Sequence, residues 1–208
     1  MALNELLTMI AEHSPSPLRI TIFGEATTNE EYTEQRQKIE AAIHSTFNPR
    51  PMLAYIAQAP LCSTLAAEVM TLKEQKAQDV VYHERYITIN NTEIISGGIY
   101  SQMQKSIDQQ AEDIFAQVGE ILASQDVKTD DIVRQWNYIE RITNLGDNGQ
   151  HYQLFNDARS KFYNSCQWDN GYPAATGIGA QVGGVVVVFD AIRNSKEHST
   201  AIDNPLQI

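Results

Sequence analysis

Apolar positions in the first 75 residues repeat with the spacings of helices and strands. A stripe that begins at Leu3 and ends at Ile10 marks a first helix, which Pro15 ends. A second, charged helix keeps an apolar face between Tyr32 and Phe47. The predicted order is a helix over residues 3–12, a strand over 18–23, a helix over 29–47, and strands over 52–58 and 65–72.

The second part of the chain repeats this order. We predict a helix over 107–124, a strand over 132–142, a turn over 144–149, a helix over 151–164, and strands over 174–180 and 185–192. Two further strands, over 80–89 and 93–99, come before this helix as a hairpin around Asn90-Asn91. The first part has no counterpart of that hairpin.

Single residues of the two parts also match. The matched residues are Tyr32 with Tyr152, Phe47 with Tyr163, Pro49 with Pro173, and Glu68-Val69 with Phe189-Asp190. We therefore predict two copies of one unit, a partial unit over 1–75 and a complete unit over 76–195, followed by a tail over 196–208. About one hairpin of sequence would have to precede Met1 to complete the first unit, so the chain is either a shortened gene product or a fragment. Helices on one face of each sheet make the fold class α+β.

Composition narrows the kind of protein. The 208 residues are 42% apolar and 20% charged, with no run near the roughly 20 apolar residues of a membrane span. The N-terminus lacks the features of a signal peptide, and Cys62 and Cys166 are too few for a disulfide framework, so we expect a cytoplasmic protein with buried thiols. A net charge of −11 disfavours nucleic acid, and an anionic substrate would need arginines inside a pocket.

Four segments resemble a known family. They are DIVRQWNYIERI, YQLFNDARSKFY, YPAATGIG and IDNPLQ. Together they are similar to the chorismatase branch of the RidA/YjgF superfamily (endoribonuclease L-PSP-like, with a chorismate-mutase-like fold). The resemblance implies two units in one chain, with the active site in the second. It also implies hydrolysis of chorismate to pyruvate and a hydroxybenzoate or dihydroxy-cyclohexadiene carboxylate, without a metal or organic cofactor.

The family acid that protonates the enol-ether methylene lies close to the C-terminus. Family chains continue beyond a segment like the one that ends here at Ile208, so we assign no catalytic residue. The wider superfamily forms trimers with clefts between subunits, and many members hydrolyse imines. They use an arginine two positions after a strand-opening proline, which is Ala175 in the second unit and Pro51 in the first. The acid expected late in the last strand falls near Val188, with Asp190 offset. Imine hydrolysis would therefore need another arginine in the cleft.

The strand over 132–142 carries candidate ligand contacts. Arg134, Trp136 and Tyr138 alternate and so share a face. A guanidinium and a phenol beside an aromatic wall suit a carboxylated ring, because arginine grips a carboxylate through two parallel hydrogen bonds. The other interpretation is a packing surface, with Arg134 extended outward.

The second helix of that unit adds two candidates, and the following strand two more. Tyr152 and Arg159 lie two turns apart on one face, and Arg159 either binds a carboxylate or pairs with Asp157 or a neighbouring unit. Thr176-Gly177 places glycine inside a strand, where a ligand can approach closely. We predict a cleft bounded by Arg134, Tyr152, Arg159 and Gly177, with Tyr138 and Thr176 as further substrate contacts.

Other polar residues favour simpler interpretations. The five histidines show no metal-ligand spacing, so we predict no metal site. The charged run Asn29–Glu40 is predicted to be a solvated helix face.

Three functions remain. The first is a chorismatase-like hydrolase that releases pyruvate from chorismate or a related cyclic enol-pyruvyl acid. The others are a catalytically impaired binding or assembly protein of the same fold, and an imine deaminase. We expect a small carboxylate such as chorismate as partner, no nucleic acid, no membrane, and a homo-oligomer (trimer or dimer), because the partial first unit leaves strand edges to be covered.

Overall fold

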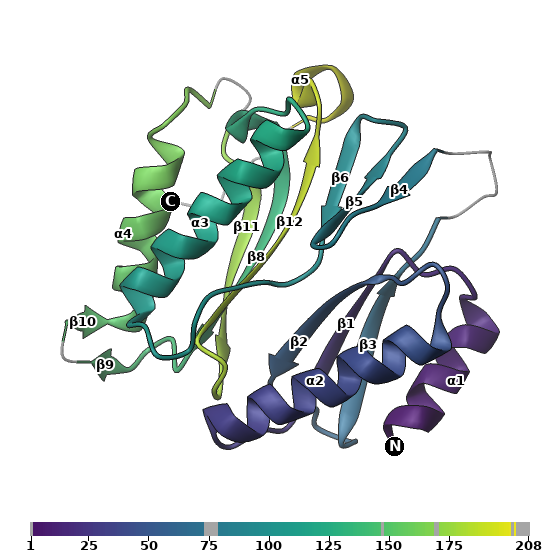
Figure 1. Ribbon diagram of the computed structural model, residues 1–208. Helices are drawn as coiled ribbons and strands as arrows, with labels where there is room; N and C mark the ends of the chain where they lie inside the picture. Colours follow the sequence, from purple (N-terminus) through teal and green to yellow (C-terminus); the bar gives the residue numbers. More distant parts are fainter. Residues whose placement is uncertain (1, 73–78, 147, 169–170, 201, 203–208) are drawn as a thin grey trace.

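The computed structural model describes residues 2–72, 79–146, 148–168, 171–200 and 202 (Figure 1). The first unit consists of α1 (Leu3–His13), β1 (Arg19–Gly24), α2 (Asn29–Thr46), β2 (Met52–Ala57) and β3 (Leu65–Met70). Each predicted element of this unit is confirmed, with ends that differ by at most two residues.

The second unit begins with β4 (Val80–Tyr82), β5 (Tyr86–Ile89), β6 (Glu93–Ser96) and β7 (Ile99–Tyr100). It continues with α3 (Ile107–Ser124), β8 (Ile132–Glu140), β9 (Leu145–Gly146), β10 (Gly149–Gln150), α4 (His151–Tyr163), β11 (Ala174–Ala180) and β12 (Val185–Ile192). A short helix, α5 (Ser195–His198), follows.

The hairpin around Asn90-Asn91 is confirmed, and both residues adopt the positive φ that the turn requires. The prediction of a single strand over 80–89 is wrong. This segment folds into β4 and β5, which pair antiparallel with each other.

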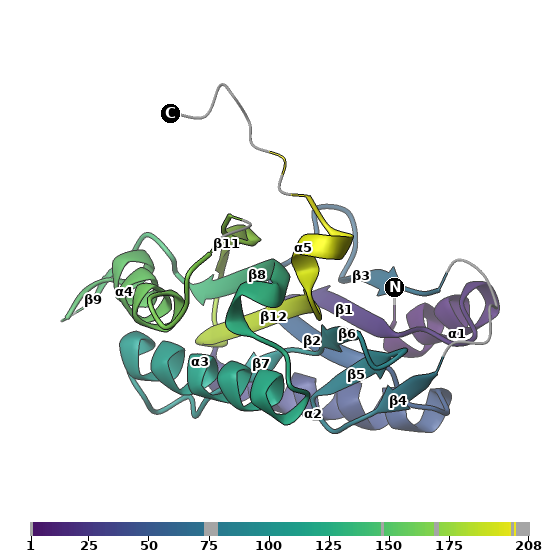
Figure 2. The same cartoon turned by 90° about the horizontal axis from the view of Figure 1, so that it is seen from above.

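The two sheets share one strand order. In the first sheet the order is β2-β1-β3, and in the second it is β11-β8-β12-β6-β5-β4, with β7 also paired to β12. β1 is parallel to β2 and antiparallel to β3, as β8 is to β11 and β12. Helices cover one face of each sheet (Figures 1 and 2). This arrangement is the predicted α+β layer fold.

The registers align the two sheets residue by residue. Arg19 lies opposite Met52 and Met70, as Arg134 lies opposite Ala174 and Asp190. Arg19 thus holds the place in the first sheet that Arg134 holds in the second.

The registers also correct two of the predicted residue matches. Pro51, not Pro49, is the residue that directly precedes its strand as Pro173 does. The match of Glu68-Val69 with Phe189-Asp190 is wrong by one residue, because Met70 stands level with Asp190.

Each unit has its own core between helices and sheet. Tyr32, Ile22 and Leu7 belong to the first core, and Phe155 and Phe189 to the second, all nearly inaccessible to solvent. Burial of aromatic and aliphatic side chains of this size is the main favourable term for each unit. Among the described residues, no helix has the length and apolar character needed to cross a bilayer.

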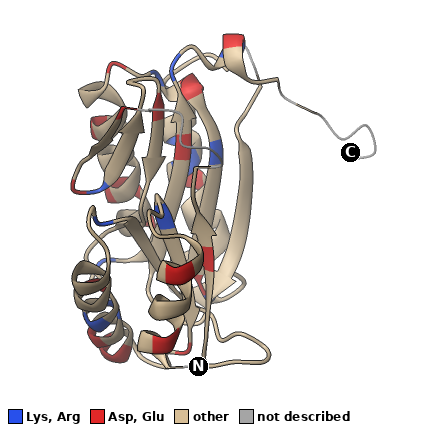
Figure 3. Ribbon diagram, turned by 90° about the vertical axis from the view of Figure 1, so that its right-hand side faces the viewer, with Lys and Arg blue, Asp and Glu red and all other residues tan. Residues whose placement is uncertain are grey.

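The faces without helices pack against each other and join the units. Ala54 and Ile56 of the first sheet contact a cluster that includes Tyr138 and Val186 of the second. The backbone of β2 is also covered by the second unit, since Gly98 N–H donates to Leu53 O at 2.8 Å and Gln181 N–H donates to Ala57 O at 2.9 Å. Acidic positions are spread over both units, in keeping with the net charge of −11 (Figure 3).

Candidate functional site

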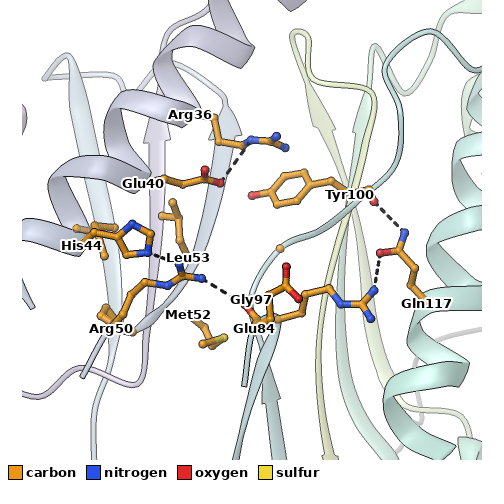
Figure 4. Close-up of a pocket in the computed structure, with 14 residues that line it drawn as sticks. Arg36, Glu40, His44, Arg50, Met52, Leu53, Glu84, Gly97, Tyr100 and Gln117 are labelled. Atoms are coloured by element: carbon orange, nitrogen blue, oxygen red, sulfur yellow. Dashed lines mark hydrogen bonds and ion pairs between the residues drawn. The ribbon is translucent and has the colours of Figure 1, made fainter. Parts of the chain in front are cut away.

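A cavity of about 360 Å³ lies between the two units (Figure 4). One wall comes from α2 and the start of β2, and the other from the β4–β5 turn, the β6–β7 connection and α3. Its polar lining residues are Arg36, Glu40, His44, Arg50, Glu84, Arg85, Tyr100 and Gln117. We call this cavity the inter-unit cleft.

The α2 wall follows from helical spacing. Arg36, Glu40 and His44 are four residues apart and therefore share one face of the helix. The guanidinium carbon of Arg36 lies 4.5 Å from the centre of the Tyr100 ring, which belongs to the second unit. The prediction that Asn29–Glu40 forms only a solvated face is therefore wrong at Arg36, whose side chain is 26% exposed.

The other two arginines are held by protein groups. Arg50 hydrogen-bonds to the His44 ring through Nη1 and donates from Nη2 to Glu84 O at 3.3 Å. Arg85 donates from Nη1 to Gln117 Oε1 at 2.8 Å. These bonds fix both guanidinium groups at the wall of the cleft.

Tyr100 forms the centre of the second wall. Its hydroxyl accepts a hydrogen bond from Tyr55 N–H at 3.0 Å, and its carbonyl accepts one from Gln117 Nε2 at 2.9 Å. Burial raises the pKa of Tyr100, so the phenol is neutral at physiological pH. An adjacent cation can therefore stack on an uncharged aromatic face.

The charges of the cleft suit a small anion. Three guanidinium groups outnumber the carboxylates of Glu40 and Glu84 on its walls. Within the described part of the chain, the Glu84 carboxylate makes no hydrogen bond or ion pair, and no cluster of His, Cys, Asp or Glu is arranged to hold a metal ion. Guanidinium groups bind planar carboxylates, and phosphates, through two parallel hydrogen bonds.

The structure divides the residues predicted from sequence between two faces of the second sheet. On the face without helices, Arg134 donates from Nη2 to Thr176 Oγ1 at 2.8 Å and stacks on Trp136 at 4.7 Å. Tyr138 is buried on the same face, and burial raises its pKa to about 12. Arg134, Tyr138 and Thr176 therefore belong to one group.

The other three predicted residues lie on the helix-covered face. The ring of Tyr152 packs so closely on Gly177 that a Cβ there would lie 3.2 Å from it. Arg159 lies 6.0 Å from the ring of Phe155 and 5.8 Å from that of Tyr163. The sheet separates this group from Arg134, and neither group lines the inter-unit cleft. A ligand role for these residues stays a prediction.

The strand register also changes which residue of the first unit corresponds to the arginine position of the superfamily. Two residues after Pro51 is Leu53, which lines the cleft, so Pro51 is not that position. Arg36 and Arg50 reach the same cavity from other elements.

The matching family model is described as chorismatase FkbO/Hyg5-like, N-terminal, and it covers residues 69–191, more than half of the chain. The chain belongs to this family. The description places the matched unit in the N-terminal part of such proteins, whereas the resemblance had implied the second, active-site unit.

Solved structures show the fold of this chorismatase-family chain. A chorismatase is 17% identical to it, with 86% of this chain and 49% of that chain covered and a TM-score of 0.57. The chain thus spans about half of that protein. A YjgF-family protein from Neisseria meningitidis (17% identity, 56% and 96% covered, TM-score 0.43) and yeast Mmf1 (19%, 55% and 89%, 0.42) also match. No curated protein sequence matches.

Proposed function

We propose that this chain is a chorismatase-like hydrolase that binds chorismate, or a related cyclic enol-pyruvyl acid, in the inter-unit cleft. The observation that carries the proposal is the convergence of Arg36, Arg50 and Arg85 on one cavity in a chain of this family. Its volume of about 360 Å³ is of the size that encloses a small ligand. Guanidinium groups at separate points suit a substrate with two carboxylates.

Hydrolysis of such an enol ether needs a proton and a water molecule. The proton adds to the methylene carbon and water adds to the neighbouring carbon. The bond from that carbon to the ether oxygen on the ring then breaks. The added water gives up its two protons, one to this oxygen and one back to the acid, which leaves pyruvate and a dihydroxy-cyclohexadiene carboxylate. Glu84 is the best-placed proton donor, because its carboxylate faces the cleft without a protein partner (Figure 4). A bound substrate would exclude water from the Glu84 carboxyl, which would then act as the general acid.

Two observations favour other outcomes. Glu84 is exposed to solvent, so that water as well as substrate can reach its carboxyl group, which favours binding without turnover. Arg36 and Arg50 supply the guanidinium groups that imine deamination needs, although Leu53 holds the superfamily's arginine position.

The test incubates the purified chain with chorismate and follows pyruvate through lactate dehydrogenase and NADH. We expect pyruvate release that Glu84→Gln abolishes while binding of 3-hydroxybenzoate, followed by calorimetry, persists. Binding without pyruvate would support the non-catalytic alternative, and faster hydrolysis of 2-aminoacrylate would support the deaminase. A folded sample that neither binds these carboxylates nor turns them over overturns the proposal.

A further inference from the structure

The three arginines of the inter-unit cleft differ in what already holds them. Arg50 bonds to His44 and to the Glu84 carbonyl, and Arg85 bonds to Gln117. The Nε atom of Arg36, in contrast, is buried and has no hydrogen-bond partner within the described residues. Its nearest carboxylate oxygen, Glu40 Oε1, lies 3.6 Å away, which is an ion pair but too long for a hydrogen bond.

A buried donor without a partner is costly, and more so on a charged group. Arg36 also cannot turn freely to find water, because its guanidinium stacks on the ring of Tyr100. That ring is itself fixed, since the Tyr100 hydroxyl accepts from Tyr55 N–H and its carbonyl accepts from Gln117. The plane of donors that Arg36 offers is therefore set before any ligand arrives.

We infer that Arg36 is the residue that receives the ligand carboxylate, with Tyr100 as its positioning residue and Glu40 as a competing carboxylate. The inference rests on the proposed function, because it names the anchor within the same cleft. A planar carboxylate that approaches Arg36 edge-on takes two parallel hydrogen bonds, one of them from Nε. The Glu40 side chain, 45% exposed, is able to swing into solvent as the ligand binds.

Replacement of Glu40 is expected to tighten binding of the ligand, whereas replacement of Arg36 weakens it. The Glu40 carboxylate screens Arg36 in the free protein and repels an anion that enters the cleft. Glu40→Gln removes the competition and the repulsion while keeping the side-chain shape. Binding of a carboxylate is therefore expected to become tighter, a gain that a merely structural residue would not give.

The experiment is calorimetric titration of the full chain with 3-hydroxybenzoate, which has no enol ether to hydrolyse. We expect Arg36→Gln to weaken binding by about tenfold or more, and Arg36→Lys to weaken it less, because lysine keeps the charge but loses the paired donors. Glu40→Gln should tighten binding a few-fold. Lys38→Gln is the matched control, since it removes a charge of α2 that is 74% exposed and outside the cleft.

The results separate this inference from the proposed function. Wild-type binding that Arg36→Gln and Arg36→Lys leave unchanged overturns the inference and leaves the proposed cleft in place. Weaker binding in Glu40→Gln also contradicts it. No binding by the wild-type chain overturns both. Thermal unfolding of each variant checks that it is folded. If Arg36→Gln does not fold, the milder change Arg36→Lys tests the inference in its place.

Discussion

The guanidinium of Arg19 in β1 lies 2.6 Å from the carboxylate of Asp190 in β12, as an ion pair between Nη1 and Oδ1. A second contact, Nη2 to Oδ2, measures 3.4 Å, and the Arg19 side chain is 3% exposed. The pair joins the first unit to the second. It therefore helps to fix the position of the two walls of the inter-unit cleft.

Loss of this pair should strongly destabilise the protein. Arg19→Met leaves the Asp190 carboxylate, only 17% exposed, without its paired cation, which is expected to cost up to about 3–5 kcal/mol of unfolding free energy. Urea denaturation measures the change. The matched control is Lys38→Met. Lys38 forms an exposed ion pair with Glu34 at 4.0 Å, and loss of this pair should lower the unfolding free energy by less than about 1 kcal/mol. Equal effects of the two substitutions would show that the Arg19 pair does not hold the units together.

The β11 edge of the second sheet is uncovered by the residues that the structure describes, unlike the β2 edge of the first sheet. β2 is buried except at half-buried Leu53, because the second unit bonds to it, whereas Ala174, Ala175 and Gly177 of β11 are exposed. β11 carries no charged residue that would block pairing with another strand. An edge of this kind favours association.

We therefore expect a homo-oligomer, a dimer or trimer, in which β11 is covered. Ala175→Lys places a charge on the edge and should shift the mass measured by light scattering toward the monomer. Ala41→Lys, on the exposed surface of α2, is the control and should change nothing. A wild-type chain that stays monomeric at high micromolar concentration contradicts this prediction.

Buried tyrosines predict a loss of stability in alkali. Burial raises the pKa of Tyr55 and of Tyr138 to about 12. In the unfolded chain tyrosine ionises near pH 10, so the unfolded state releases these protons first. The stabilisation is complete below pH 10 and is lost as the pH rises from 10 to about 12. Urea midpoints across this range should fall for the wild type and fall less for Tyr138→Phe. A parallel fall in both would contradict the assignment of Tyr138.

The order of helices and strands could be predicted because it depends on local spacing of apolar residues. The stripe over 3–12 and the β-branched run over 18–23 each determine an element by themselves. The residues of the predicted cleft lie on two faces of the second sheet for an equally local reason. Neighbouring residues of a strand point to opposite faces, so Thr176 and Gly177 cannot both face one pocket.

The inter-unit cleft could not be found this way. Arg36 of α2 and Arg50 of the following loop belong to the first unit, and they meet Arg85 of the β4–β5 turn only when the units dock. Residue spacing along the sequence does not show this. One signal was present in α2, where Arg36, Glu40 and His44 repeat every four residues. The equivalence of Arg19 and Arg134 comes only from the strand registers, because the segment between strand and proline differs in length in the two units.

The ligand role predicted for Arg134 can be separated from that of the cleft. Arg134 bonds to Thr176 Oγ1 and Ala174 O within its own sheet, so we expect Arg134→Gln to leave the calorimetric affinity for 3-hydroxybenzoate within about twofold, because no bond to the ligand is removed. Arg36→Gln is compared in the same titration. Loss of binding in Arg134→Gln alone would place the ligand on the second sheet.

Hydrogen–deuterium exchange with and without 3-hydroxybenzoate tests most directly the central claim, that a small carboxylate binds in the inter-unit cleft. We expect slower exchange on both walls at once, in residues 36–53 and 84–100, with little change in 134–138 and 174–177. Slower exchange confined to those second-sheet segments, or no change anywhere at saturating ligand, would contradict it.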